Sequence, residues 1–135
     1  MRPAEPEKFV GIISATYGKD PTDPHWQETL EYNEWLAWMK KYNTSSNVAD
    51  ADTVYAYSAV QTMVAVLEAR GDNLTRENLI KPAASIRGLQ LPMLLPGIIA
   101  STSANDFAPI KQMRLQKFDG TTWQLFGEVT SGSGS

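Results

Sequence analysis

The pattern of apolar and polar positions predicts one short strand near the start of the chain. Residues 9–14, FVGIIS, form an apolar run rich in β-branched residues, which predicts a buried strand. The proline-rich stretch KDPTDP follows at residues 19–24 and blocks both helix and strand, because each proline restricts the residue before it. We expect Asp23 to cap a helix that has Pro24 at its first position.

The next segments have helical spacing. A first helix is predicted from His25 to Tyr42, with an apolar inner stripe that comprises Tyr32, Trp35, Met39 and Tyr42. A second helix, over residues 53–70, is apolar almost all round, and this predicts that it is buried between layers. We expect Asp52 to cap the second helix and Gly71 to end it.

The remaining third of the chain changes from helical to alternating spacing. A third helix is expected after its cap at Thr75, kinked or broken at Pro82. Residues 91–103, LPMLLPGIIASTS, have room for a short extended segment. Residues 110–118 alternate, the pair Asp119-Gly120 is a hairpin signal, and residues 121–129 form the return strand. We take residues 1–130 as one partial domain and residues 131–135, SGSGS, as a flexible tail.

Composition narrows the classes of function. The formal net charge of −3 argues against a nucleic-acid partner, because neutralising phosphates requires a basic surface. The sequence has no cysteine, so disulfides and thiolate chemistry are excluded. No run reaches the roughly 18 apolar residues of a membrane span. The start, MRPAEPEKF, lacks the apolar core of a signal peptide, so we expect either a cytoplasmic chain or the interior of a longer secreted precursor.

Candidate catalytic residues are few. His25 is the single histidine, with Asp20, Asp23 and Glu28 near it in sequence, and an enzyme built around it is one hypothesis. The alternative, an exposed histidine in the first turn of a helix, is the commoner situation. We expect no metal and no cofactor, because the chain has no ligand spacing, no glycine-rich phosphate loop and no nucleophile elbow. We therefore favour a protein that is not an enzyme.

Two tyrosines lie where ligands often bind. Tyr17 follows the end of the first predicted strand, and Tyr55 falls in the first turn of the second helix. In open α/β sheets, ligands bind beyond the carboxyl ends of the strands, and aromatic residues there commonly line organic sites. Packing in the core is the alternative for both residues.

The order of these features resembles a known family. The segments KDPTDPHW, DTVYAYSAVQTMVAVLEARGDNLTRENLIK, LPMLLPGI and QMRLQKFDGTTWQLFGEV together resemble the C-terminal third of the branched-chain amino-acid-type substrate-binding proteins of ABC transporters, over about residues 9–129. The resemblance implies an α/β chain: a partial Rossmann-like lobe of a type I periplasmic binding fold, with three helices on a sheet and a C-terminal β-hairpin. Residues 98–107, IIASTSANDF, depart from the usual Asn-Thr-Ser-Pro pattern of the family.

The resemblance also implies a function and partners. Members of the family bind a small solute between two lobes, outside the cytoplasm, and deliver it to an ABC permease. For this chain it implies an amino acid or an aromatic or aliphatic acid as solute, with Tyr17, Asp52 and Tyr55 nearest the cleft and the N-terminal lobe as a partner. The alternative is a structural or interaction module that self-associates through exposed apolar faces without binding a solute.

Overall fold

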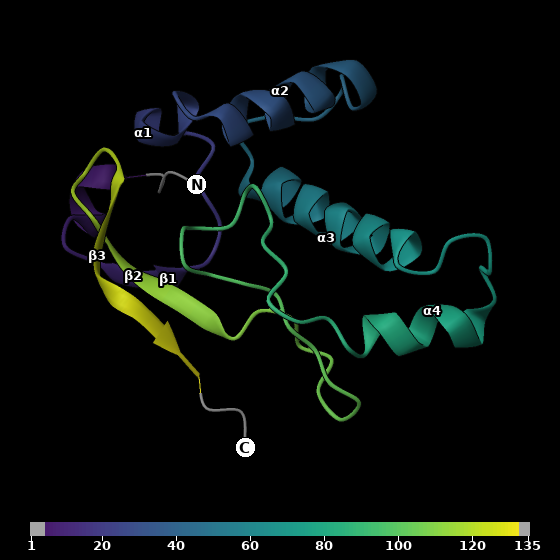
Figure 1. Ribbon diagram of the computed structural model, residues 1–135. Helices are drawn as coiled ribbons and strands as arrows, with labels where there is room; N and C mark the ends of the chain where they lie inside the picture. The colour runs from purple at the N-terminus through teal and green to yellow at the C-terminus, as the bar shows by residue number, and fades with distance from the viewer. Residues whose placement is uncertain (1–4, 133–135) are drawn as a thin grey trace.

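The computed structural model describes residues 5–132 and has a sheet on one side and helices on the other (Figure 1). The elements in chain order are η1 (Pro6–Phe9, a 3-10 helix), β1 (Ile13–Thr16), α1 (Pro24–Gln27), α2 (Leu30–Tyr42), α3 (Ala51–Glu68), α4 (Arg76–Ala83), β2 (Gln112–Phe118) and β3 (Trp123–Ser131). The long connection from α4 to β2 runs between the sheet and α3. The chain is therefore mixed α/β, as expected, and its described residues form four α-helices in place of three.

The three strands form an antiparallel sheet in the order β1-β2-β3. Ala15 pairs with Leu115, and Leu115 pairs with Phe126 on the other side. A Rossmann-like lobe is expected to have parallel strands, and these three strands differ from that expectation. The hairpin is confirmed: β2 and β3 are joined through Asp119 and Gly120, whose φ of 104° suits glycine.

The first strand differs from its prediction in position and in burial. The chain begins with η1, which has Pro6 in its first turn, and then bends at Gly11, whose φ is 91°. The strand consequently starts only at Ile13, which is 59% exposed. β1 is an edge strand that pairs on one side with β2. The apolar run predicts a strand, but it does not show whether other residues will pack on the side chains of that strand.

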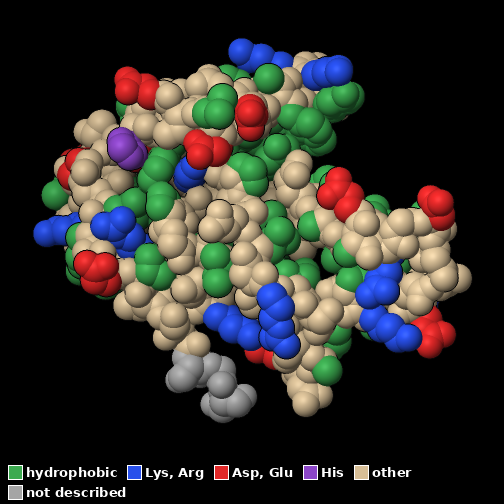
Figure 2. Space-filling model, viewed as in Figure 1, with side chains coloured by type: hydrophobic (Ala, Val, Ile, Leu, Met, Phe, Trp, Pro, Cys, Tyr) green, Lys and Arg blue, Asp and Glu red, His purple; other side chains and the backbone are tan. Residues whose placement is uncertain are grey.

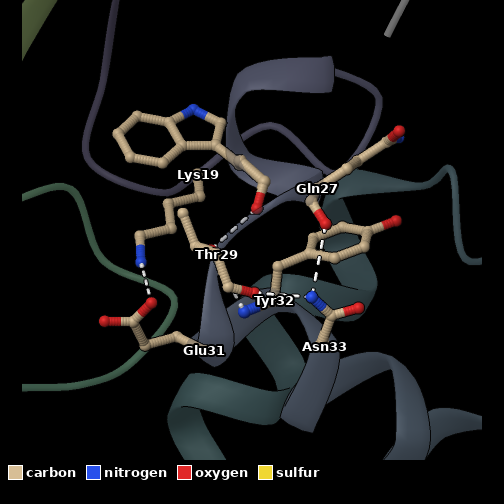
Figure 3. A network of polar contacts seen from close by, with 7 residues as sticks. Lys19, Gln27, Thr29, Glu31, Tyr32 and Asn33 are labelled. Atoms are coloured by element: carbon tan, nitrogen blue, oxygen red, sulfur yellow. Dashed lines mark hydrogen bonds and ion pairs between the residues drawn. The ribbon is translucent and has the colours of Figure 1, made fainter.

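The single helix predicted from His25 to Tyr42 is two helices. Asp23 caps α1 as predicted, since its carboxylate accepts a hydrogen bond from the His25 backbone N–H at 2.9 Å. Thr29 then starts α2: its hydroxyl donates to the Trp26 carbonyl at 2.7 Å and accepts from the Tyr32 N–H at 3.4 Å (Figure 3). One threonine thus closes one helix and opens the next.

The buried stripe of α2 is confirmed except at its end. Tyr32, Trp35 and Met39 are buried, whereas Tyr42 is 62% exposed because the last turn of the helix extends beyond the core.

The second predicted helix corresponds to α3, with two corrections. Its cap is Asp50, whose carboxylate accepts from the backbone N–H of Asp52 at 3.1 Å. Asp52 therefore lies inside the first turn. The helix is also not buried all round, since Tyr55 and Met63 are 62% and 55% exposed. One side of α3 faces the rest of the chain, and the described residues leave the other uncovered.

The third predicted helix, α4, starts after Thr75 as predicted. It ends one residue beyond Pro82, which confirms the expected break.

The core consists of two clusters that share the segment 91–100. One cluster comprises Trp26, Leu91, Leu94, Leu95, Ile98 and Ala100. The other comprises Tyr32, Trp35, Met39, Val54, Tyr57 and Met93. The sequence predicted only a short extended segment here. In the structure it forms isolated bridges, such as that between Leu89 and Ala100. Because it fixes both clusters, this irregular segment determines where the start of α3 lies relative to β1.

Two further observations complete the fold. Among residues 5–132, no helix is both long and apolar enough to cross a membrane. Of the predicted flexible tail, Ser131 ends β3 and the Gly132 N–H donates to the Lys111 carbonyl at 2.8 Å. The other tail residues, 133–135, lie outside the described part of the chain.

Candidate functional site

An open cavity of about 810 Å³ lies where the carboxyl end of β1 meets the first turns of α3. Tyr17, Asp52 and Tyr55, the three residues singled out from the sequence, all line it. Its apolar lining includes Ala15, Val54, Leu94 and Met113. The cavity therefore combines apolar lining residues with phenol and carboxylate groups, and this combination is typical of sites for small organic molecules.

The loop after β1 is held by the backbone of the core segment. The Leu95 N–H donates to the Tyr17 carbonyl at 2.8 Å, and the Lys19 N–H donates to the Met93 carbonyl at 2.9 Å. The Thr16 hydroxyl donates to the Gly18 carbonyl at 3.2 Å. Tyr17 thus projects from a fixed backbone rather than from a free loop.

The first turns of α3 supply the facing wall. Asp52 and Tyr55 are three residues apart, a spacing that brings side chains together on one helix face. Ser58, one turn further along, also lines the cavity. Its hydroxyl already donates to the Val54 carbonyl at 2.9 Å, so that donor is occupied.

The charges of Asp52 and Tyr55 affect the ionisation of Tyr17. The pKa of the Tyr17 phenol is raised, first by burial and then by the negative charges that Tyr55 and Asp52 can carry. Within residues 5–132, no hydrogen bond engages the Tyr17 or Tyr55 hydroxyl or the Asp52 carboxylate. These groups are thus free to contact a bound molecule.

Two other charged residues of the wall are already engaged. The Asp20 carboxylate accepts from both the backbone N–H and the hydroxyl of Thr22, at 2.8 and 2.7 Å. The Lys19 side chain is buried, with its ammonium 3.7 Å from a Glu31 carboxylate oxygen and 5.3 Å from the ring centre of Trp26 (Figure 3). Lys19 thus ties the loop after β1 to the start of α2.

His25 lies outside this site. It is exposed on α1, with its ring edge-on to Trp26 at a centroid distance of 4.6 Å, and it does not line the cavity. Among residues 5–132, no cluster of three or more potential metal ligands occurs. On the face seen in Figure 2, lysine and arginine side chains lie in separate groups rather than in one continuous basic surface.

The sequence analysis did not predict the residues of the β2–β3 hairpin that line the cavity. Met113, Gln116 and Trp123 line the cavity although they are about a hundred residues from Tyr17. They reach it because β2 pairs with β1, with Arg114 opposite Thr16. The alternation of residues 110–118 predicts a strand, but it carries no information about which strand pairs with it.

Comparison with solved structures finds a protein of the same architecture. It is a branched-chain amino acid ABC transporter protein from Thermus thermophilus, solved with bound valine. The match has a TM-score of 0.69 and 13% sequence identity, and covers 94% of this chain. The chain has the fold of part of that binding protein. It spans 35% of the length of that protein.

Comparisons of the sequence give no further assignment. No family model matches the chain, and no curated protein matches it. The structural match is to part of a transporter protein with bound valine. It confirms the resemblance seen in the sequence at the level of the fold, and the likeness is only partial.

Proposed function

We propose that the chain forms one wall of a solute site in an extracytoplasmic receptor that serves an ABC importer. The solute is an amino acid or a related small carboxylate. One observation carries the proposal: Tyr17, Asp52 and Tyr55 all line one open cavity, and no hydrogen bond from residues 5–132 engages their hydroxyl and carboxylate groups. The fold is shared with part of a transporter protein that holds valine, and this supports the same conclusion.

The chemistry of the cavity suits an amino acid. The Asp52 carboxylate is a partner for an ammonium group, and the Tyr17 and Tyr55 hydroxyls are donors for a carboxylate. An apolar side chain would rest on Val54 and Leu94. The site is open, so the opposite wall would come from a second lobe, and the ABC permease would be the partner of the closed pair.

The first experiment measures ligand binding by thermal unfolding, followed by tryptophan fluorescence, with valine, leucine, phenylalanine and benzoate. A ligand that binds only the folded chain stabilises it by about 2.7 kcal/mol at a hundredfold excess over its dissociation constant. Tyr55→Ala should abolish the shift. Tyr42→Ala is the matched control, since both tyrosines are 62% exposed and Tyr42 lies outside the cavity. No shift with any solute, or equal loss in both variants, would remove the support for a solute site.

A second pair of variants tests the ammonium contact. Asp52→Asn should weaken binding of amino acids while leaving benzoate binding unchanged or stronger. Glu77→Gln is the control, because Glu77 lies in the first turn of α4, as Asp52 does in that of α3, but outside the cavity. If Asp52→Asn left amino-acid binding intact, the ammonium would have to bind elsewhere.

A second candidate function is a self-associating interaction module. The observation that favours it is the uncovered sheet: Leu115 and Phe126, which share one face, are 38% and 37% exposed. Among the described residues, no strand pairs with the other edge of β1.

A further inference from the structure

A buried lysine follows Tyr17 by two residues in the loop after β1. The Lys19 side chain is only 6% exposed, although lysine is almost never buried in proteins unless its charge is paired. Removing an ammonium group from water is costly, and an apolar side chain of similar size would avoid that cost. The position of this charge, beside the proposed solute site, indicates a role other than packing.

Both partners of the Lys19 ammonium come from the junction between α1 and α2. Its Nζ lies 3.7 Å from a carboxylate oxygen of Glu31, in the first turn of α2, and 5.3 Å from the ring centre of Trp26, in α1 (Figure 3). The pKa of Glu31 is lowered, first by a hydrogen bond from its own backbone N–H and then by the charge of Lys19. The carboxylate is therefore ionised at neutral pH, and the two groups attract each other as a charged pair.

The backbone of the loop is attached to a different part of the chain. The Tyr17 carbonyl accepts a hydrogen bond from the Leu95 N–H at 2.8 Å, and the Lys19 N–H donates to the Met93 carbonyl at 2.9 Å. Because both bonds lead to the segment 93–95, they fix a line and still permit the loop to rotate about it. The Lys19 ammonium reaches α2, and this attachment to a second element opposes the rotation.

An ordinary stabilising ion pair is the simpler explanation for the contact between Lys19 and Glu31. Exposed pairs contribute little to stability, and the pair of Lys81 with Glu77 on α4, whose atoms are 3.9 Å apart, is an example. A buried pair is often no more stabilising than apolar residues of similar volume, and in some proteins it instead fixes one arrangement of the elements that it joins. Stability alone therefore does not account for a buried charge at residue 19.

We propose that Lys19 is a positioning residue of the solute site: by binding Glu31, it holds the Tyr17 hydroxyl where the carboxylate of the solute binds. This role rests on the proposed function, in which Tyr17 makes that contact. The ammonium itself lies against Glu31 and Trp26 and is not a ligand of the solute. Loss of the ion pair should therefore weaken solute binding through Tyr17.

A double-mutant cycle on the full chain tests this role by calorimetric titration at neutral pH. The probe is whichever of valine, leucine, phenylalanine and benzoate binds most tightly, since all four carry a carboxylate. Lys19→Met should weaken binding by at least about tenfold, the value of one charge-assisted hydrogen bond. In the Tyr17→Phe background, Lys19→Met should have no further effect on affinity. Equal losses in both backgrounds would overturn the proposal, because Lys19 would then act independently of the Tyr17 hydroxyl.

Amide hydrogen exchange of the solute-free chain provides a readout that needs no ligand. Lys19→Met should speed the exchange of the Leu95 N–H, which donates to the Tyr17 carbonyl. The Ala100 N–H, which is hydrogen-bonded within the same core segment, should keep its rate. Equal acceleration at both amides would show a general loss of stability and would overturn the proposal. Glu31→Gln should give the selective pattern too and, since Glu31 is 48% exposed, it remains informative if Lys19→Met fails to fold.

Lys81→Met is the matched control, because it breaks an ion pair of the same type outside the cavity. It should leave solute affinity and the exchange of the Leu95 N–H unchanged. If a solute binds and Lys19→Met leaves its affinity unaltered, the proposed function stands and the role of Lys19 is overturned. If the unaltered chain binds none of the four solutes, the proposed function fails and the exchange experiment decides: selective acceleration at Leu95 supports the role of Lys19 in holding the loop, and its absence overturns that role.

Discussion

The phenol of Tyr17 is harder to ionise in the folded chain than in the unfolded one. Burial raises its pKa above the ordinary value near 10, and the charges of Tyr55 and Asp52 raise it further. In the folded chain the phenol therefore keeps its proton to higher pH than in the unfolded chain. The contribution of Tyr17 to stability is complete below about pH 10 and is lost as the pH rises through the folded pKa.

Replacing Tyr17 should therefore flatten the alkaline limb of the stability profile. Tyr17→Phe cannot ionise, so its unfolding midpoint should fall less between pH 9 and pH 11 than that of the unaltered chain. Scanning fluorimetry at several alkaline pH values measures this. Identical slopes in the unaltered chain and Tyr17→Phe would contradict the burial and charge contacts that define this wall of the cavity.

At the scale of the elements, two threonines each precede a helix, but they differ in their side-chain hydrogen bonds. The Thr29 hydroxyl bonds to both the end of α1 and the start of α2, whereas Thr75 makes no side-chain hydrogen bond to α4. Thr29→Ala should cost about 1 kcal/mol of stability, the typical loss for a helix cap. Thr75→Ala should cost clearly less. Urea unfolding of both variants provides the comparison, and equal losses would show that the Thr29 contacts do not stabilise the junction.

Elements with local signals were predictable from the sequence, and those shaped by distant partners were not. The Asp23-Pro24 start, the α2 stripe and the Asp119-Gly120 hairpin depend on neighbouring residues. Each was confirmed, except that Tyr42 at the end of the stripe is exposed. The core role of residues 91–100 has no periodicity to reveal it.

The residues of the candidate site also fall into those that local sequence signals predict and those that only distant strand pairing brings to the cavity. Tyr17 and Tyr55 follow from a strand end and a helix start, whereas Gln116 and Trp123 reach the cavity through strand pairing.

At the scale of the whole molecule, the exposed apolar surface is unevenly placed. On the sheet, Ile13, Leu115 and Phe126 are each at least about a third exposed. On the helical side, Val60 and Met63 of α3 and Ile80 of α4 are about half exposed. These are the two faces that α/β lobes cover with further layers. In this chain the described residues leave them bare, and bare apolar faces favour association.

Sedimentation equilibrium decides between the two candidate functions at this scale. If the sheet face and the free edge of β1 pair with a second copy, the average mass should rise with concentration. Leu115→Lys should return the chain to monomer, because a charge would be buried in the pair without a partner. Leu30→Lys is the control, since Leu30 is 70% exposed at the start of α2, away from the sheet. A chain that remains monomeric at every concentration would rule out the self-associating module. Association lost equally in both variants would place the contact somewhere other than the sheet.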